Sequence, residues 1–396
     1  MSQADDLLSP AGAELLSRLR GQHVTPDRAL SLADELRGGH QPELVAAALT
    51  QQALRTAAAQ KFSRAGDMLF TRAGLEQASS ELTARHSASR FSGLDLVADL
   101  CSGIGGNLIA LSAAARQVIA VDADLDTLRF AGHNASAYGA RDRVALVCAD
   151  VRDVHLTPRV GATFVDPARR ARGRRLKAGS SEPSLTWCFG LADSVPRVCI
   201  KSAPGLPREL VPPGWETEFV ATGRALKEAL LWSPGFATTT RRATILPAAA
   251  TLVSSPGDPV PVGEPGEYLL DPNPAVTRAG LVQELGRALG ARQLDELTAF
   301  LSLDKPVQTP FARTLRIVES MPWHERQMAR RLRELGVGAA DIRRRGLAGD
   351  VEQIHRRLGL QGSRSATIVI TRRAGTPWGL ICEAVAGQAA GSDVPS

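Results

Sequence analysis

The sequence predicts an α/β fold with a doubly wound, Rossmann-like parallel sheet, and three observations support this prediction. Short β-rich apolar runs alternate with stretches of helical spacing in the middle of the chain. Such alternation is typical of a parallel sheet with helices on both faces. A glycine-rich turn follows the first run, and aspartates stand at the ends of the next three. The runs cover residues 95–100, 117–122, 143–150, 162–167 and 197–202.

Length and composition indicate an ordinary globular protein of two or three domains, because 396 residues exceed one typical core. Apolar residues make up 44% of the chain and charged residues 22%, near globular averages. The net charge of +6 is compatible with a polyanionic partner but is too small to establish one. The start of the chain lacks a signal-peptide pattern, and no stretch approaches 18 uncharged apolar residues. We therefore expect a cytoplasmic protein with no membrane partner.

The cysteines predict neither disulfides nor a metal site. They are odd in number and scattered, and no Cys or His pair has metal-ligand spacing. We expect all of them to be small buried apolar side chains. They are Cys101, Cys148, Cys188, Cys199 and Cys382.

Composition and periodicity divide the chain into four parts. Residues 1–60 show helical spacing of apolar residues and predict an N-terminal helical subdomain. Residues 61–250 form the sheet domain, which should end in antiparallel strands because its last apolar runs have no helix-length insert between them. Residues 251–267 are rich in Pro and Gly and predict a linker. Residues 268–388 predict a small α+β domain, with helical spacing over 276–301.

The strongest functional signal is the glycine-rich segment that begins at Asp99, at the end of the first strand and directly before a helix. Glycines allow a tight turn and close approach of a ligand, and the helix N-terminus offers free N–H groups. Asp122 ends the next strand, 19 residues after Gly103, where a carboxylate can accept hydrogen bonds from both ribose hydroxyls. The expected cofactor-binding residues here are Asp99, Ser102, Gly103, Gly105, Gly106, Asn107, Asp122 and Ala123.

A nicotinamide-dinucleotide site would use the same strand, turn, helix and distal acid. Two details disfavour it. Leu108 stands where the third glycine of the GxGxxG pattern would fall, and the Asp99 carboxylate would repel a pyrophosphate. S-adenosyl-L-methionine has no phosphate and carries a cationic sulfonium and an ammonium. The loop therefore favours S-adenosyl-L-methionine as the cofactor.

The third strand ends in Asp150 and Val151, an acid and an apolar side chain that could accept the amino group of an adenine and cover its face. Taken alone, an aspartate after a strand is also a common helix cap. In combination with the two earlier motifs, we expect Asp150 and Val151 to bind the cofactor.

The fourth strand ends in Asp166 and Pro167, which we expect to be the catalytic residues. Ligands gather at the carboxyl ends of strands in such sheets. A carboxylate, or a carbonyl held by the fixed φ of proline, could accept a hydrogen bond from an attacking amine. The alternative is that Asp-Pro only opens a turn.

Two basic clusters are candidate RNA contacts. Arg169 and Arg170 begin a run, 169–177, with six basic residues in nine positions. Residues 343–345 form a second cluster of three arginines, expected in a turn of the tail domain. Neutralising phosphates would give salt-sensitive RNA affinity, although such runs are often only solvated.

Several of these motifs together resemble the trimethylguanosine synthase branch of class I methyltransferases. The resemblance spans about residues 61–235 and includes KFSR at 61–64, DMLFT at 67–71, the ADLCSGIGGN loop and HNASAYG at 133–139. It implies a preceding helical extension that closes over the methyl donor. The sequence departs from that family at Asp166, where the family has a Ser-Pro-Pro-Trp signature, so a cap guanine is not the expected acceptor.

The tail resembles the THUMP-like domain of bacterial methyltransferases. THUMP domains bind RNA, so the resemblance implies an RNA acceptor, tRNA or rRNA. The candidate substrate-binding residues are then Lys61, Arg64, Arg169, Arg170, Arg344 and Arg345. A non-catalytic RNA-binding protein and a small-molecule or protein methyltransferase stay open as alternatives, as does the oligomeric state.

Overall fold

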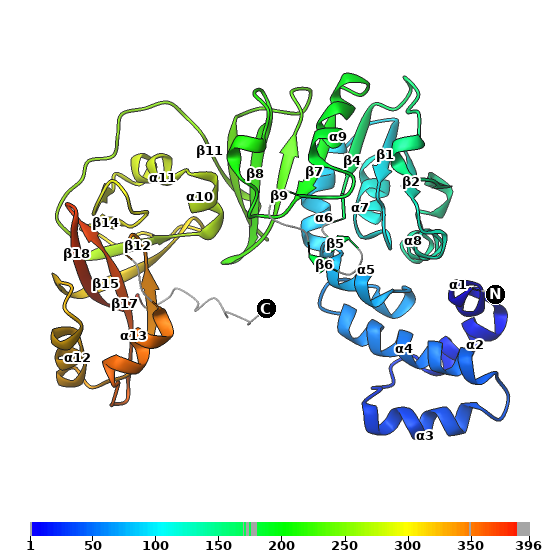
Figure 1. The fold of residues 1–396 in the computed structure, drawn as a ribbon, viewed down its shortest axis with the longest axis horizontal. Coiled ribbons are helices and arrows are strands. Elements are labelled where there is room, and N and C mark those ends of the chain that lie inside the picture. The colour runs from blue at the N-terminus through cyan, green and yellow to red at the C-terminus, as the bar shows by residue number, and fades with distance from the viewer. Residues whose placement is uncertain (1, 169, 172–173, 176–179, 348–349, 386–396) are drawn as a thin grey trace. The chain divides into compact units, whose positions relative to one another are not determined.

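The computed structural model describes residues 2–168, 170–171, 174–175, 180–347 and 350–385. The chain forms two compact units (Figure 1). The first comprises 1–217 and 228–238, and the second comprises 218–227 and 239–396. None of the helices in the described ranges is long and apolar enough to cross a membrane.

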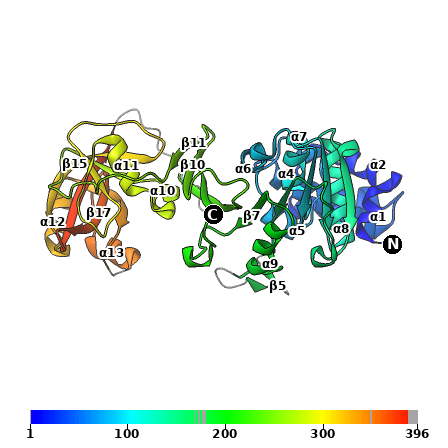
Figure 2. The same ribbon diagram turned by 90° about the horizontal axis from the view of Figure 1, so that it is seen from above.

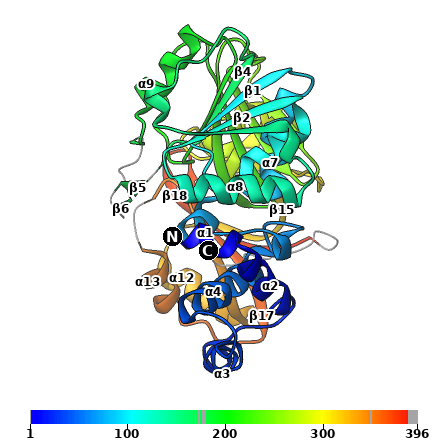
Figure 3. The same cartoon turned by 90° about the vertical axis from the view of Figure 1, so that its right-hand side faces the viewer.

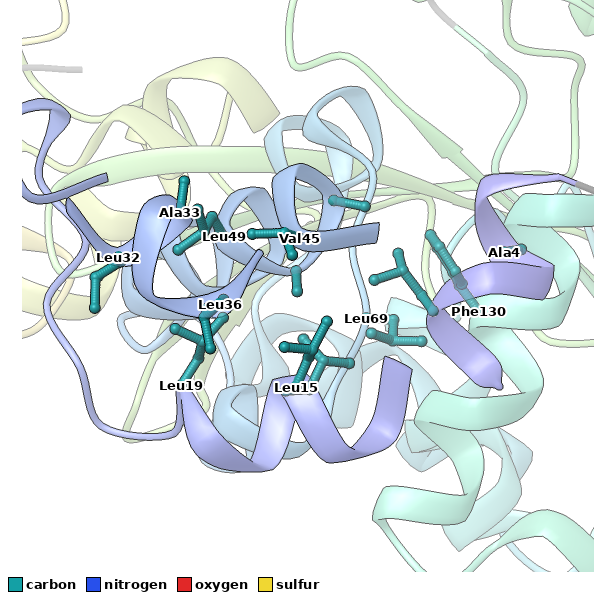
Figure 4. Packing of buried hydrophobic residues seen from close by; sticks show 14 residues of the cluster. Ala4, Leu15, Leu19, Leu32, Ala33, Leu36, Val45, Leu49, Leu69 and Phe130 are labelled. Carbon is teal, nitrogen blue, oxygen red and sulfur yellow. The ribbon is translucent and has the colours of Figure 1, made fainter. Parts of the chain in front are cut away.

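Helices form the N-terminal part of the first unit, as the apolar spacing predicted. Ser9 and Thr25 cap two of them, each with a proline at the first turn, where proline's fixed φ suits a helix start. Their apolar side chains share one core with Leu69 and with Phe130 of α8 (Figure 4). The first helix contacts α8, beside which it lies in Figure 2. The helices are α1 (Gln3–Leu8), α2 (Pro10–Arg18), α3 (Pro26–Leu36) and α4 (Pro42–Ala58).

The large sheet has the strand order β11-β10-β8-β9-β7-β4-β1-β2-β3. Its centre is parallel, because β1 pairs with β2 and β4, β2 with β3, and β4 with β7. Pairs β7–β9 and β10–β11 are antiparallel, which confirms the predicted antiparallel ending. The strands are β1 (Leu96–Leu100), β2 (Gln117–Asp122), β3 (Val144–Cys148), β4 (Ala162–Val165), β7 (Val198–Ser202), β8 (Glu216–Thr222), β9 (Ala225–Trp232), β10 (Arg241–Leu246) and β11 (Ala250–Val253).

Helices cover both faces of the parallel strands (Figure 3). Helix α7 contacts β1 and β2 and lies between α6 and α8, whereas α9 packs on the other side through Leu185 and Cys188. Strand order reverses between β1 and β4, which opens a crevice at their carboxyl ends. These helices are α5 (Arg72–Gln77), α6 (Glu81–Ala88), α7 (Gly106–Ala114), α8 (Leu125–Ala137) and α9 (Leu185–Gly190). Short elements are β5 (Arg170–Ala171), β6 (Arg174–Arg175) and the 3-10 helices η1 (Ala65–Asp67), η2 (Ser89–Phe91), η3 (Arg141–Arg143), η4 (Val151–Asp153), η5 (Leu191–Asp193) and η6 (Arg208–Leu210).

The second unit holds a seven-stranded sheet of order β13-β14-β12-β15-β18-β17-β16. Within the described part of this sheet, β16 and β17 pair in parallel, and the other neighbouring strands pair antiparallel. Its strands are β12 (Tyr268–Pro272), β13 (Arg292–Gln293), β14 (Leu301–Leu303), β15 (Ala312–Pro322), β16 (Val337–Arg344), β17 (Arg364–Arg373) and β18 (Thr376–Ala384). Its helices are α10 (Pro274–Ala279), α11 (Val282–Leu289), α12 (Glu325–Glu334) and α13 (Val351–Leu358).

Three expectations for this part of the chain were wrong in detail. The helical spacing over 276–301 breaks at Gly290, which ends α11 with a positive φ, and strands β13 and β14 follow. The expected basic turn is instead the end of strand β16, because pairing with β17 extends through Arg344. Strand β11 also runs three residues into the expected linker, to Val253, through pairing with β10.

The cysteines match the expectation only in part. Cys188, Cys199 and Cys382 are buried, and none of the five cysteines, all of which are described, forms a disulfide. Cys101 is half-buried and Cys148 is exposed. Cys148 ends β3, an edge strand with only one neighbour in the described sheet, so less of its surface is covered.

A set of buried side chains ties the segment 68–70 to the rest of the first unit. Asn134 of α8 accepts a hydrogen bond from Leu69 N at 2.7 Å and donates to Leu69 O and to Ile104 O at 2.9 and 2.8 Å. From α4, the Gln51 amide exchanges two hydrogen bonds with Phe70, and Arg55 Nε donates to a neighbouring carbonyl. These contacts join the N-terminal helices to the glycine-rich loop.

We predict that Asn134→Ala destabilises the protein strongly. Three buried backbone groups would lose their partner, at about 1 kcal/mol or more each, so the free energy of unfolding should fall by about 3 kcal/mol. Urea denaturation followed by circular dichroism measures this change. Ser136→Ala is the matched control, because Ser136 is exposed on the same helix and its loss should change stability by less than about 0.5 kcal/mol. Equal stability of the two variants would contradict the assignment.

Candidate active site

The glycine-rich loop joins β1 to α7 and depends on backbone conformations that side chains disfavour. Gly103 and Gly105 have φ of +55° and +87°. A Cβ on Gly105 would also lie 3.2 Å from the Cα and Cβ of Ala131, so α8 packs directly against the loop. Cys101, with φ of 60°, is a non-glycine residue in this region, which marks local strain.

Asp122 connects the end of β2 to this loop. Its Oδ2 accepts a hydrogen bond from Gly103 N at 2.8 Å, and its Oδ1 accepts one from Asp124 N at 3.0 Å. Each carboxylate oxygen keeps a second acceptor site. The side chain is half-buried and lines a cavity, so it can still accept hydrogen bonds from a ribose.

The cavity has a volume of about 390 Å³ and brings most of the predicted residues together. From the loop and β2 it is lined by Ser102, Gly103, Gly106, Asn107 and Asp122. The predicted catalytic pair, Asp166 and Pro167, lines the same cavity from the end of β4.

A short helix that precedes the first strand in sequence supplies one wall of the cavity. Thr71, Gly74 and Gln77 come from the start and body of α5. Lys61, predicted to bind substrate, instead fastens this wall: its ammonium donates to the carbonyls of three residues in 75–78, at 2.7 to 3.2 Å. No signal at the level of single residues singled out Thr71 or Gln77 in the sequence. Only the resemblance in segment 67–71 pointed towards this region.

Asp99 lies in β1 next to the cavity and has an unusual environment. Its side chain is 1% exposed, and neither carboxylate oxygen has a hydrogen-bond partner among the described residues. Burial raises the pKa of the Asp99 carboxyl to about 8, and the charges of Asp166 and Asp122 act in the same direction. A buried acid without a partner suits a cationic ligand group.

The remaining predicted cofactor residues are not among those that line the cavity. The Asp150 carboxylate accepts hydrogen bonds from Arg152 N and from its guanidinium, and these lower the pKa of Asp150 to about 2. Val151 is buried in the core between the sheet and α9. Ala123 and Gly105 do not line the cavity, and Gly105 packs on Ala131 of α8. For Asp150, the geometry matches the capping interpretation, since it caps η4.

The predicted phosphate-binding arginines lie in different surroundings. Arg64 pairs with Asp67 at 3.3 Å, beside the first unit's own N-terminal segment. In the second unit, Arg344 donates to Leu347 O, and Arg345 pairs with the buried Asp271 at 3.2 Å. Arg169 lies outside the described residues, and for Arg170 only the backbone, in β5, is described. Among the described side chains of the first unit, that of Arg64 is not one of those that line the cavity.

The sequence analysis missed two buried charged residues beside the cavity. Lys201 ends β7, and its Nζ lies 2.6 Å from Asp166 Oδ2. Glu228 lies in β9 with its side chain 4% exposed. A charge directly after the apolar run Val198–Ile200, at the carboxyl end of a parallel strand, was the available signal for Lys201.

Comparison with known proteins agrees with this geometry. Proteins from two strains of Mycobacterium tuberculosis, CDC 1551 and H37Rv, are 36% identical to this chain over 315 residues. Each is named an uncharacterised S-adenosylmethionine-dependent methyltransferase, and the match spans 77% of this chain and 84% of the relative.

The chain belongs to the S-adenosylmethionine-dependent methyltransferases.

Family models and a solved structure extend the comparison. Residues 94–176 match the RNA cap guanine-N2 methyltransferase model, 312–384 match the THUMP domain-like model, and 1–58 match a domain of unknown function. The structure of a proposed methyltransferase from Porphyromonas gingivalis W83 has a TM-score of 0.74 and 21% identity. It covers 94% of this chain and 98% of its own, which shows that the two share a fold.

The residues present fit S-adenosyl-L-methionine. The unpartnered Asp99 carboxylate can receive the ammonium, and Asp122 can receive the ribose hydroxyls. The positive φ of Gly103 and Gly105 holds the loop in the turn beside the cavity.

We predict that Asp122→Ala weakens the binding of S-adenosylhomocysteine about ten- to a hundredfold, the range for one or two charge-assisted hydrogen bonds. Isothermal titration calorimetry measures the affinity. Asp142→Ala, which removes an exposed carboxylate before β3, should bind as the wild type does. Wild-type affinity in Asp122→Ala would reject the ribose role.

The raised pKa of Asp99 predicts that cofactor binding depends on pH. Below about pH 8 the free enzyme holds Asp99 mainly neutral, whereas the ammonium of the cofactor favours the ionised form. Binding should therefore release a proton, and affinity should rise from pH 6 to pH 8. Calorimetry in buffers of different ionisation enthalpy counts the protons. In Asp99→Asn the release should disappear, and a release that persists would assign it to another group.

Proposed function

We propose that this methyltransferase methylates a nitrogen of an RNA base, in tRNA or rRNA, with Asp166 as the catalytic carboxylate. The observation that carries the proposal is the position of Asp166 and Pro167. They line the same cavity as Gly103 and Asp122, at the end of β4. An acceptor at this edge would meet the methyl donor and the carboxylate together.

Methyl transfer requires the protein to align the two reactants and to accept one proton. When bound, S-adenosyl-L-methionine supplies an electrophilic methyl group on its sulfonium. An exocyclic amine that gains this methyl must lose a proton, which Asp166 can accept. The backbone N–H of Asp166 donates to Leu100 O at 3.2 Å, and buried Pro167 fixes the chain after it. Proximity and orientation then provide most of the acceleration.

Support for an RNA acceptor comes from the matched family models and from the distribution of charge. The RNA cap guanine-N2 methyltransferase model covers the cavity loop and Asp166, and the THUMP domain-like model covers the tail. The basic run 169–177 follows Asp166 closely in sequence and would offer phosphate contacts near the acceptor. We favour this run over Arg344 and Arg345, whose guanidinium groups make internal hydrogen bonds.

A purely RNA-binding protein on this fold is the weaker candidate. Such a protein would need neither an acid held at the cavity by a buried lysine nor an unpartnered Asp99 beside the cofactor loop. Both features are present here.

We predict that RNA from cells lacking this protein lacks one N-methylated nucleoside, and that the purified enzyme restores it with S-adenosyl-L-methionine. Nucleoside mass spectrometry of separated tRNA and rRNA identifies the base. Asp166→Asn should lower the rate about 10²- to 10⁴-fold, the usual contribution of a general base. Asp142→Asn serves as the surface control. Unchanged nucleosides in both RNA fractions would leave a small molecule or a protein as the acceptor.

A further inference from the structure

Lys201 is a buried ammonium beside the reacting edge of the sheet. It ends β7, its side chain is 5% exposed, and its Nζ lies 2.6 Å from Asp166 Oδ2. Asp166 itself is 24% exposed and lines the cavity. Burying an ammonium is costly unless it is paired with an acid. The contact therefore accounts for the burial of Lys201, but it also constrains Asp166.

The other titratable groups around Asp166 are acidic. Asp99 and Asp122 lie close enough to influence one another and Asp166 electrostatically. The Cys101 thiol is also near, and burial raises its pKa, so it stays neutral. Lys201 is the one basic group among the described residues that contacts the Asp166 carboxylate in this acidic surrounding.

Glu228 flanks Lys201 from the neighbouring strand β9. Its Oε2 accepts a hydrogen bond from Ser79 Oγ at 3.0 Å, whereas its Oε1 has no partner among the described residues. Burial raises the pKa of Glu228, the Lys201 charge opposes that rise, and His86 also faces it. Three carboxyl groups, those of Asp99, Asp166 and Glu228, thus interact with Lys201 at this edge of the sheet.

We propose that Lys201 is the positioning residue of the reaction: it holds one oxygen of Asp166 and keeps that carboxylate ionised among its acidic neighbours. The second oxygen is then left for the acceptor. The link to proton acceptance rests on the proposed function of Asp166, but the ionisation of Asp166 by Lys201 can be tested without any RNA.

Removing the lysine charge has two outcomes that can be told apart. If Lys201 keeps Asp166 ionised, Lys201→Met allows Asp166 to take up a proton, so both charges of the pair disappear together and the net charge beside the cavity stays the same. If Asp166 stays ionised by itself, the same substitution removes only a positive charge, and the cavity becomes more negative.

The experiment compares the affinities of S-adenosylmethionine and S-adenosylhomocysteine by calorimetry. The two differ by the methyl group and the positive charge of the sulfonium, so the ratio of their affinities reports the negative charge of the cavity. We expect Lys201→Met to leave the preference for S-adenosylmethionine within about twofold of the wild-type value, whereas Asp166→Asn, which leaves the lysine charge uncompensated, should lower it about tenfold. Lys201→Arg should keep the preference near the wild-type value. Lys227→Met, at an exposed lysine of β9, is the matched control.

A double variant separates the proposal from simple damage to the fold. Lys201→Met combined with Asp166→Asn should show the same preference as Lys201→Met, because Asp166 is already neutral in the single variant. Thermal unfolding identifies variants that fail to fold, and in that case Lys201→Arg and Asp166→Asn carry the comparison. A preference that rises about tenfold in folded Lys201→Met would overturn the role of Lys201, because Asp166 would then be ionised without the lysine.

Activity provides the second measurement. With RNA from deletion cells as substrate, Lys201→Met should lower kcat and leave KM for RNA unchanged, and Lys201→Arg should recover part of kcat. If wild-type enzyme methylates no RNA while Lys201→Met and the double variant share the same, unraised cofactor preference, the RNA proposal fails and the role of Lys201 stands. If the preference rises in Lys201→Met, the role of Lys201 fails whatever the acceptor.

Discussion

The hydrogen bonds of the Asn134 amide are the constraint on which the active site depends. One buried side chain of α8 satisfies the N–H and C=O of Leu69 and the C=O of Ile104. Leu69 belongs to the segment that leads into α5, and Ile104 lies inside the glycine-rich loop. The Asn134 amide therefore positions both α5, which forms one wall of the cavity, and the glycine-rich loop. Unmet buried backbone groups are costly, so the two segments are difficult to separate while α8 stays folded.

The N-terminal helices take part in this arrangement and are more than an appendage. Gln51 of α4 pairs with both backbone groups of Phe70, and Leu69 packs into the core that α1 to α4 share with Phe130. Lys61 then fixes the carboxyl end of α5. The resemblance implied a helical extension that closes over the donor, and these hydrogen bonds give a physical basis for such a cover.

Charge is distributed differently in the two units. Around the cavity, the carboxyl groups of Asp99, Asp122 and Asp166 lie close enough to interact, and the ionised form of Asp99 would suit a cationic cofactor. In the second unit, the buried Asp271 pairs with Arg224 and Arg345, and Arg313 lies 3.9 Å from it. Those arginines stabilise the packing of that unit around one carboxylate. The basic pI of the chain therefore does not by itself identify an RNA-binding surface.

The sequence alone determined the features that depend on local order along the chain. A strand, a glycine turn, a helix and a distal acid follow one another at fixed spacing, so this spacing is enough to place Gly103, Asp122 and Asp166 at one sheet edge. The antiparallel ending and the helical N-terminus followed from periodicity in the same way. The helix and strand boundaries of the tail domain were harder to predict from the sequence. Gly290 ends a helix, and the strands after it form through pairing that the spacing of apolar residues does not reveal.

Only the tertiary structure decided which side chains meet. Lys201 reaches Asp166 across 35 residues of sequence, and α5 reaches the loop from before the first strand. Conversely, Asp150 and Arg345 are residue types that could bind a ligand, but each already pairs with an oppositely charged side chain of the protein. A residue type records what a side chain can bind, whereas burial and neighbours determine what it does bind. Those neighbours come from distant parts of the chain, which is why the contact between Lys201 and Asp166 is visible only in the folded molecule.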